Sequence, residues 1–177
     1  MAPERPAYLV ASWPLGSAHS VAVRSIGPAD RESEAAFLLG LSRDTRYNRF
    51  LGGGVALTSA RLEELTRLDF RRDAALAATV TLDRTETLVG VARYVRLDDA
   101  GSCECAIVVA DLWQGYGIGR KLLASLAQHA RAQGVARMLG DVLAMNTPML
   151  RLARSQGARI EPHPEGAQLR RVVLELR

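Results

Sequence analysis

The segment Gln114-Gly115-Tyr116-Gly117-Ile118-Gly119 decides how this chain folds. It follows the apolar run 105–110 and opens a strongly helical run from Arg120 to Gln133. When a strand, a glycine loop and a helix follow one another in this order, the glycines let the backbone turn its N–H groups toward one point. The helix start adds unpaired N–H groups and the positive end of its dipole. The sequence therefore predicts a phosphate cradle here.

Two common phosphate-binding loops do not fit this segment. A Walker loop ends in Gly-Lys-Ser/Thr, but here Gly119 is followed by Arg120 and Lys121, with no hydroxyl to hold magnesium. A Rossmann fingerprint has Gly-x-Gly-x-x-Gly spacing and lies early in a βαβ unit. Gly115, Gly117 and Gly119 instead lie two residues apart and late in the chain. A different phosphate-binding loop is needed.

The composition suits one globular domain. The chain has 177 residues, of which 48% are hydrophobic, and this is enough for a core. It has neither an apolar run of about 18 residues nor the start of a signal peptide, so we expect a cytoplasmic protein with no membrane partner. Two cysteines, Cys103 and Cys105, cannot complete a zinc site, and no metal is expected.

The charge pattern is basic but scattered. The net charge is +4, and Lys121 is the only lysine among 23 basic residues. The pairs Arg71-Arg72 and Arg170-Arg171 are too short to indicate nucleic-acid binding. The arginines therefore predict a solvated surface, although a basic surface would also favour coenzyme A or an acidic partner.

Hydrophobic periodicity and turn residues predict the order β-α-α(α)-β-β-β-α-β-α-β-β after a tail or extended arm at residues 1–19. Residues 20–177 are expected to form the single domain. The expected strands are 19–26, 75–82, 87–97, 102–110, 136–143, one at Ile160, and 168–176. The expected helices run from Asp30 to Leu41, to Phe50 after a cap at 42–45, from Thr58 to about Leu68, from Arg120 to Gln133, and from Asn146 to Gly157.

Gln114, Gly117 and Gly119, read as Gln-x-x-Gly-x-Gly within this element order, resemble the pyrophosphate loop of GNAT acetyltransferases. The resemblance covers about residues 20–176. It implies an α/β GNAT fold with a mixed, mostly antiparallel sheet of about six to seven strands flanked by helices. The sheet would be splayed between its fourth and fifth strands, 102–110 and 136–143. It also implies acetyl-CoA as cosubstrate and an amine as acceptor.

The same resemblance assigns contacts to acetyl-CoA. Backbone N–H groups of the loop would hold the pyrophosphate, and the splayed edge of the fourth strand would pair with the pantetheine amides. A strand N–H near Val108 would stabilise the oxyanion. Asn146 would contact the pantetheine arm, but it equally suits a helix N-cap. The predicted contact residues are Ile107, Val108, Val109, Gln114, Gly115, Tyr116, Gly117, Ile118, Gly119, Arg120 and Asn146.

Glu104 is the predicted general base. A lysine amine with a pKa near 10.4 must lose a proton before it attacks a thioester. Strand alternation puts Glu104 on one face with Ala106 and Val108, opposite the cysteines. Apolar neighbours would raise its pKa toward neutrality, unless it is simply an exposed glutamate at the start of a strand.

Other candidate groups have weaker support. The two cysteines have no adjoining histidine or aspartate to activate a nucleophile. His19, His129 and His163 are expected to be structural or surface groups, with His129 on the solvent face of its helix. Many GNAT proteins carry a tyrosine as acid for the leaving thiolate where this chain has Ala153. Tyr116 is a poor substitute, so the acid is unassigned.

The segment from Leu41 to Leu51 resembles the Ser-x-x-Ser/Thr-x-Tyr-x-Arg-Phe helix of bacterial Pat-type protein lysine acetyltransferases. This resemblance implies a protein lysine as acceptor. The alternatives are a small-molecule amine as acceptor, or a non-catalytic acyl-CoA-binding module. The protein is expected to be a monomer or a homodimer. The arginines of the segment could also form an exposed helix face, with Tyr47, Phe50 and Leu51 packed inward.

Overall fold

The computed structural model describes residues 9–17, 19–54, 56–99 and 101–176. Across these ranges eight strands form one sheet in the order β1-β2-β3-β4-β5-β6-β8-β7. All neighbours are antiparallel except β5 and β6, which are parallel. The strands are β1 (Leu9–Leu15), β2 (His19–Ser25), β3 (Asp73–Leu82), β4 (Thr85–Arg96), β5 (Ser102–Val109), β6 (Arg137–Leu143), β7 (Arg159–Pro162) and β8 (Leu169–Glu175).

Strand β1 was not expected. Residues 1–19 were predicted to be a tail or extended arm, but residues 9–15 join the sheet and bring it to eight described strands instead of six or seven. Ala11, Trp13 and Leu15 alternate with exposed residues and pack against the core. Lys121 Nζ lies 4.6 Å from the Trp13 ring centroid. The remainder of the predicted tail, residues 1–8, lies outside the described ranges.

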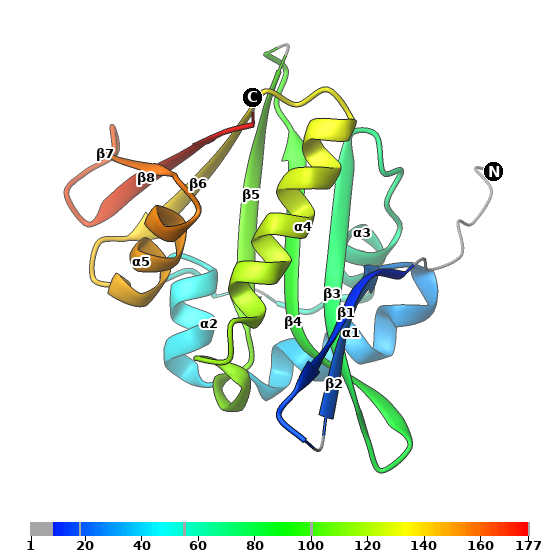
Figure 1. Cartoon of the computed structure of the whole chain (residues 1–177). Coiled ribbons are helices and arrows are strands. Elements are labelled where there is room, and N and C mark those ends of the chain that lie inside the picture. Colours follow the sequence, from blue (N-terminus) through cyan, green and yellow to red (C-terminus); the bar gives the residue numbers. More distant parts are fainter. Residues whose placement is uncertain (1–8, 18, 55, 100, 177) are drawn as a thin grey trace.

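Helices cover both faces of the sheet (Figure 1). They are α1 (Arg31–Gly40), α2 (Arg43–Arg49), α3 (Ser59–Thr66), α4 (Ile118–Ala132) and α5 (Thr147–Ser155), with short 3-10 turns η1 (Pro28–Asp30) and η2 (Asp111–Trp113). Leu122 and Leu126 of α4 pack on one face, and Phe37 and Leu38 of α1 pack on the other. Leu122 and Leu126 have the i, i+4 spacing of an amphipathic helix, and on α1 Leu39, next to the buried pair, is exposed.

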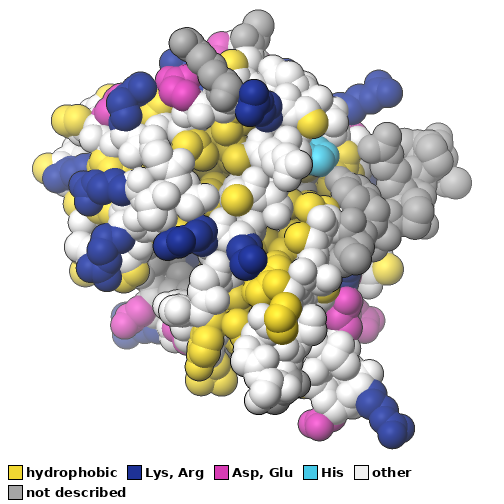
Figure 2. Space-filling model, viewed as in Figure 1, with side chains coloured by type: hydrophobic (Ala, Val, Ile, Leu, Met, Phe, Trp, Pro, Cys, Tyr) yellow, Lys and Arg dark blue, Asp and Glu magenta, His cyan; other side chains and the backbone are white. Residues whose placement is uncertain are grey.

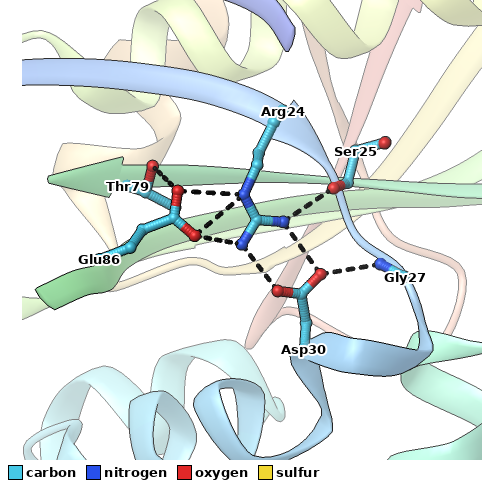
Figure 3. A network of polar contacts seen from close by, with 6 residues as sticks. All are labelled: Arg24, Ser25, Gly27, Asp30, Thr79 and Glu86. Carbon is cyan, nitrogen blue, oxygen red and sulfur yellow. Dashed lines mark hydrogen bonds and ion pairs between the residues drawn. The ribbon is translucent and has the colours of Figure 1, made fainter. Parts of the chain in front are cut away.

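A polar network fixes the start of α1 to the sheet (Figure 3). The Arg24 guanidinium donates to Asp30 Oδ1 at 2.7 Å and to Glu86 Oε1 at 2.6 Å. Gly27 N–H donates to Asp30 Oδ2 at 2.8 Å, and Thr79 Oγ1 donates to Glu86 Oε2 at 3.2 Å. One guanidinium therefore joins β2, η1 and the β3–β4 hairpin.

The sheet opens between β5 and β6. These strands pair only where Ser102, Cys103 and Glu104 face Arg137, Met138 and Leu139. Beyond that point β6 turns away with β8 and β7 (Figure 1), and α5 packs on this smaller part of the sheet through Leu150 and Ala153. The predicted GNAT fold and its splay are confirmed. The splay matters because it leaves one edge of β5 without a neighbouring strand.

Candidate functional site

A cleft of about 640 Å³ occupies the splay. Its walls come from β5, β6, the glycine loop, the starts of α4 and α5, and one side of α2. It is lined from both sides of the sheet, by Ile107 and Val109 on the α4 side and by Ala106 and Val108 on the α2 side. Figure 2 shows hydrophobic side chains along the middle of the α4–α5 face, Lys and Arg side chains beside them, and Asp and Glu toward the rim.

The glycine loop has the backbone that an anion cradle needs. Gly115 and Gly117 have φ of 84° and 80°, the left-handed region that other residues adopt at a cost. A Cβ at either position would meet nothing within 4 Å, so the glycines are required by the backbone and the space beside them is open. Gly117 is the N-cap residue of α4, so no N-cap side chain accepts a hydrogen bond from the first turn of the helix. The first N–H groups of α4 therefore remain for a ligand.

The loop side chains differ in where they lie. Ile118 is buried, so only its backbone can contact a ligand, and Tyr116 is 59% exposed and does not line the cleft. Arg120 does line it, together with Arg151 from α5. These two arginines add positive charge beside the loop.

The backbone N–H and C=O groups of β5 point alternately toward β4 and into the splay. Ser102 O accepts from Leu97 N–H, and Ala110 N–H donates to Val89 O, both toward β4. Because backbone groups alternate along a strand, those of Val108 also point toward β4, while those of Ile107 and Val109 point into the splay. The oxyanion donor expected near Val108 is therefore better placed at Ile107 or Val109.

The side chain of Gln114 is exposed but bonds to neighbouring protein groups. Its Nε2 donates to Val109 O at 3.0 Å and to Thr45 Oγ1 at 3.3 Å. It therefore supports the loop and occupies one acceptor of the β5 edge. Asn146 caps α5, since its Oδ1 accepts from Met149 N–H at 3.3 Å. Asn146 also lines the cleft, so the two interpretations of this residue are compatible.

Glu104 lies in the last pair before the splay, opposite Leu139. It shares a face with Ala106 and Val108, as alternation predicted, but its side chain is exposed and does not line the cleft. The expected apolar enclosure is therefore absent around it. Among the residues described, none forms a hydrogen bond or ion pair with the Glu104 carboxylate. Its charge acts on Arg49 and Arg171 and tends to raise the pKa of each.

Asp141 of β6 lines the cleft and was missed from the sequence. Its Oδ1 accepts from Arg171 Nε at 2.7 Å, and its Oδ2 accepts from Arg171 Nη2 at 3.1 Å. His163 Nδ1 accepts from Glu165 N–H at 3.1 Å, and its Nε2 lies 3.1 Å from Asp141 Oδ2 and 2.8 Å from Arg171 Nη2. Burial alone would raise the pKa of Asp141, but these hydrogen bonds outweigh it and lower the pKa. Both oxygens are thus occupied.

Helix α2 faces the cleft in a way the sequence did not predict. Thr45, Asn48 and Arg49 line the cleft, while Tyr47 and Leu51 are exposed. The inward packing expected for Tyr47 and Leu51 is therefore wrong. Phe50 does pack against the core and Arg43 and Arg46 are exposed, whereas Arg49 lines the cleft. Burial lowers the pKa of Arg49 to about 10. Its guanidinium lies 5.0 Å over the Phe50 ring.

The two cysteines, His129 and His163 have environments that favour packing over catalysis. Burial raises the pKa of the Cys103 and Cys105 thiols to about 12, so neither is a thiolate near neutral pH. His163 is buried against Asp141. His129 was expected on a solvent face but is half-buried, with Nδ1 3.2 Å from the Tyr94 hydroxyl. Its helix is turned so that this ring meets β4.

The residue at the position where many GNAT proteins carry the acid tyrosine is Ala153, which packs against the sheet. Ala153 is buried among the residues that join α5 to the sheet, and it also lines the cleft. Tyr116, the substitute considered above, does not line the cleft. No acid for the leaving thiolate is assigned.

Residues 45–158 match the model of the acetyltransferase (GNAT) family. The chain belongs to the GNAT acetyltransferase family. Acetyltransferase PA5475 of Pseudomonas aeruginosa is 34% identical over 143 residues, which are 81% of this chain and 77% of that protein. This GNAT chain is therefore an acyltransferase of a family that uses acetyl-CoA.

Solved GNAT structures share the fold. The GNAT domain of S. lividans PAT superimposes with a TM-score of 0.82 at 25% identity, covering 93% of this chain and 96% of that one. A cAMP-binding acyltransferase from Mycobacterium smegmatis gives 0.64 at 23% identity, covering 97% of this chain and 48% of that one. The putative acetyltransferase yncA of Salmonella typhimurium, solved with acetyl-CoA, gives 0.62 at 22% identity, covering 89% and 94%. No helix within the described part of this GNAT chain is long and apolar enough to span a bilayer.

Proposed function

We propose that this GNAT protein transfers an acetyl group from acetyl-CoA directly to the side-chain amine of a protein lysine, in a ternary complex. The observation that carries the proposal is the cleft through the splay. It runs from the glycine loop on the α4 side to Thr45, Asn48 and Arg49 on the α2 side. A site lined from both faces of a sheet lets two substrates approach one point from opposite sides.

The residues of the cleft fit acetyl-CoA. The open space beside Gly115 and Gly117 admits a pyrophosphate, and the splayed edge at Ile107 and Val109 has backbone groups for the pantetheine amides. When bound, acetyl-CoA supplies an activated acetyl thioester. The predicted contacts at the loop, at this edge and at Asn146 remain part of the proposal.

Glu104 acts as the general base in this proposal. Its unpartnered carboxylate can accept a proton from the acceptor amine, directly or through one water. Asp141 is the competing carboxylate because it lines the cleft, but Arg171 and His163 occupy both of its oxygens. A carboxylate held in this way is a weak base.

The preference for a protein lysine is supported by the Pat-like sequence of α2 and by the likeness to the S. lividans PAT domain. A small amine remains the second candidate acceptor. We place the protein in the cytoplasm, as a monomer or homodimer.

Incubation of the purified protein with acetyl-CoA and either lysine-containing proteins or a panel of polyamines, amino acids and aminoglycosides tests the acceptor. We expect thiol release with proteins and acetyl-lysine by mass spectrometry. Turnover only with small amines would contradict the lysine assignment. Acetyl-CoA binding without turnover on any acceptor would indicate a binding module.

Paired substitutions test the base. Glu104→Gln should lower kcat by roughly 10²–10⁴-fold while acetyl-CoA still binds with unchanged affinity in calorimetry. Asp141→Asn, the matched change at the competing carboxylate, should lower kcat by much less. The reverse order would move the base role to Asp141.

A further inference from the structure

Helix α2 is too small to be stable by itself. It has seven residues and none of its side chains is fully buried. Isolated helices of this length are unstable in water, so contacts outside the helix must hold it. Yet three of its residues, Thr45, Asn48 and Arg49, form the α2 side of the cleft.

The contact that holds its start is Asp111. The carboxylate accepts three hydrogen bonds: from Ser42 N–H at 2.9 Å, from Ser42 Oγ at 2.6 Å and from Thr45 Oγ1 at 2.7 Å. Ser42 is the N-cap of α2, and its Oγ accepts from Thr45 N–H at 3.1 Å. One carboxylate thus holds both the cap and the first turn of the helix.

Asp111 also belongs to the loop side of the site. It begins η2, which leads directly into Gln114 and the glycine loop. Gln114 Nε2 donates to Thr45 Oγ1 as well, so a second hydrogen bond joins the loop to the same turn of α2. Burial alone would raise the pKa of Asp111, but the hydrogen bonds from Ser42 and Thr45 outweigh it and lower the pKa. The carboxylate is therefore ionised near neutral pH.

We propose that Asp111 is a positioning residue that couples occupancy of the glycine loop to the order of α2, so that bound acetyl-CoA completes the acceptor side of the cleft. An anion bound to the glycine loop restricts the motion of the loop and of the adjoining turn η2. Four hydrogen bonds join Asp111 and Gln114 to residues 42–45, so the motion of α2 is restricted as well. The inference rests on the proposed function, because it takes the α2 side as the side of the acceptor. It predicts that acetyl-CoA binding favours acceptor binding.

Amide hydrogen exchange of residues 43–50, with and without acetyl-CoA, tests the coupling before any acceptor is added. In the unaltered protein, acetyl-CoA should slow exchange in α2 about fivefold or more, the lower range of typical coupling between sites. Asp111→Ala should abolish this slowing. Asp44→Ala removes an equally exposed acid from the first turn of α2 and should leave the slowing intact.

A second variant distinguishes the loss of these hydrogen bonds from a general loss of structure. Thr45→Val removes only one donor to Asp111 together with the Gln114 contact, so it should reduce the slowing partly. At saturating acetyl-CoA, Asp111→Ala should raise the acceptor KM about tenfold, within the usual range of coupling energies, and change kcat less.

Two results of the exchange experiment would overturn the coupling: full slowing of exchange in Asp111→Ala, or no slowing in the unaltered protein although calorimetry shows that acetyl-CoA binds. An unchanged acceptor KM in Asp111→Ala would overturn it too. Absence of acetyl-CoA binding in calorimetry would overturn the proposed function itself, so the two failures are distinguishable.

Discussion

Gly117 shows how much of the site depends on one backbone angle. Its φ of 80° is costly for any residue with a Cβ, yet the space beside it is open. Gly117→Ala should cost about 1–2 kcal/mol of stability through backbone strain. It should also weaken acetyl-CoA binding, because the backbone N–H groups of the loop would no longer converge on the pyrophosphate. Urea unfolding and calorimetry measure the two effects.

Gly134 supplies the matched control for Gly117. It has the same φ of 80°, nothing lies within 4 Å of a Cβ there, and it follows the far end of α4. Gly134→Ala should lose similar stability and keep the acetyl-CoA affinity. If both variants bind acetyl-CoA as well as the unaltered protein, the loop is not the pyrophosphate site.

For single residues, the sequence predicts the face of a strand but not the exposure of a side chain or its contacts with distant segments. The face on which Glu104 lies follows from strand alternation and was predicted correctly. Its exposure was the alternative to the favoured apolar enclosure, and the sequence could not decide between them because exposure depends on how far β6 turns away. Asp141, Thr45 and Arg49 reach the cleft from segments distant in sequence, so no local pattern marks them.

At the scale of elements, α4 packs against β4 around Gly90 with little room to spare. A Cβ on Gly90 of β4 would lie 2.9 Å from Leu122 Cδ1 of α4 and 3.3 Å from Val108 O of β5. Gly90→Ala must therefore push α4 outward or strain the strand, at about 1–3 kcal/mol. Urea unfolding measures the cost.

Gly40 is the control for this substitution. It ends α1, its φ is not positive and nothing lies within 4 Å of a Cβ there. Gly40→Ala should be neutral or slightly stabilising, since alanine favours helix. Equal stability of the two variants would mean that α4 does not pack on β4 as described.

The helices and the paired strands were largely predictable because their signals are local. Thr58 and Ser42 cap α3 and α2 as expected, and Asn146 caps α5. Strand β1 was missed although Ala11, Trp13 and Leu15 alternate with exposed residues. Pro14 interrupts the strand pattern, and only an edge position, with β2 on one side, tolerates it.

At the scale of the whole molecule, acid should weaken the attachment of α1 to the sheet. Burial alone would raise the pKa of Asp30, but its hydrogen bonds with Arg24 and Gly27 outweigh it and lower the pKa. The hydrogen bond from Arg24 also lowers the pKa of Glu86. Because both folded pKa values lie below the unfolded ones, their stabilisation is present above about pH 4–5 and is lost as pH falls through the folded values.

Urea unfolding at pH 7, 5 and 3.5 tests this linkage. The free energy of unfolding should fall with pH in the unaltered protein, and the fall should be smaller in Asp30→Asn. Asp98→Asn changes a fully exposed acid that lies 3.6 Å from Arg72 and should follow the unaltered protein. An identical pH dependence in all three proteins would mean that Asp30 is not held by Arg24 in solution.

We propose that acetyl-CoA binds in the splay between β5 and β6, with its acetyl end toward the side of Glu104. A crystal structure with coenzyme A bound tests it most directly. We predict the pyrophosphate against the N–H groups of Gly115 to Arg120, the pantetheine along Ile107 and Val109, and the sulfur facing Glu104. Coenzyme A bound outside the splay, or a sulfur turned away from Glu104, would contradict the account.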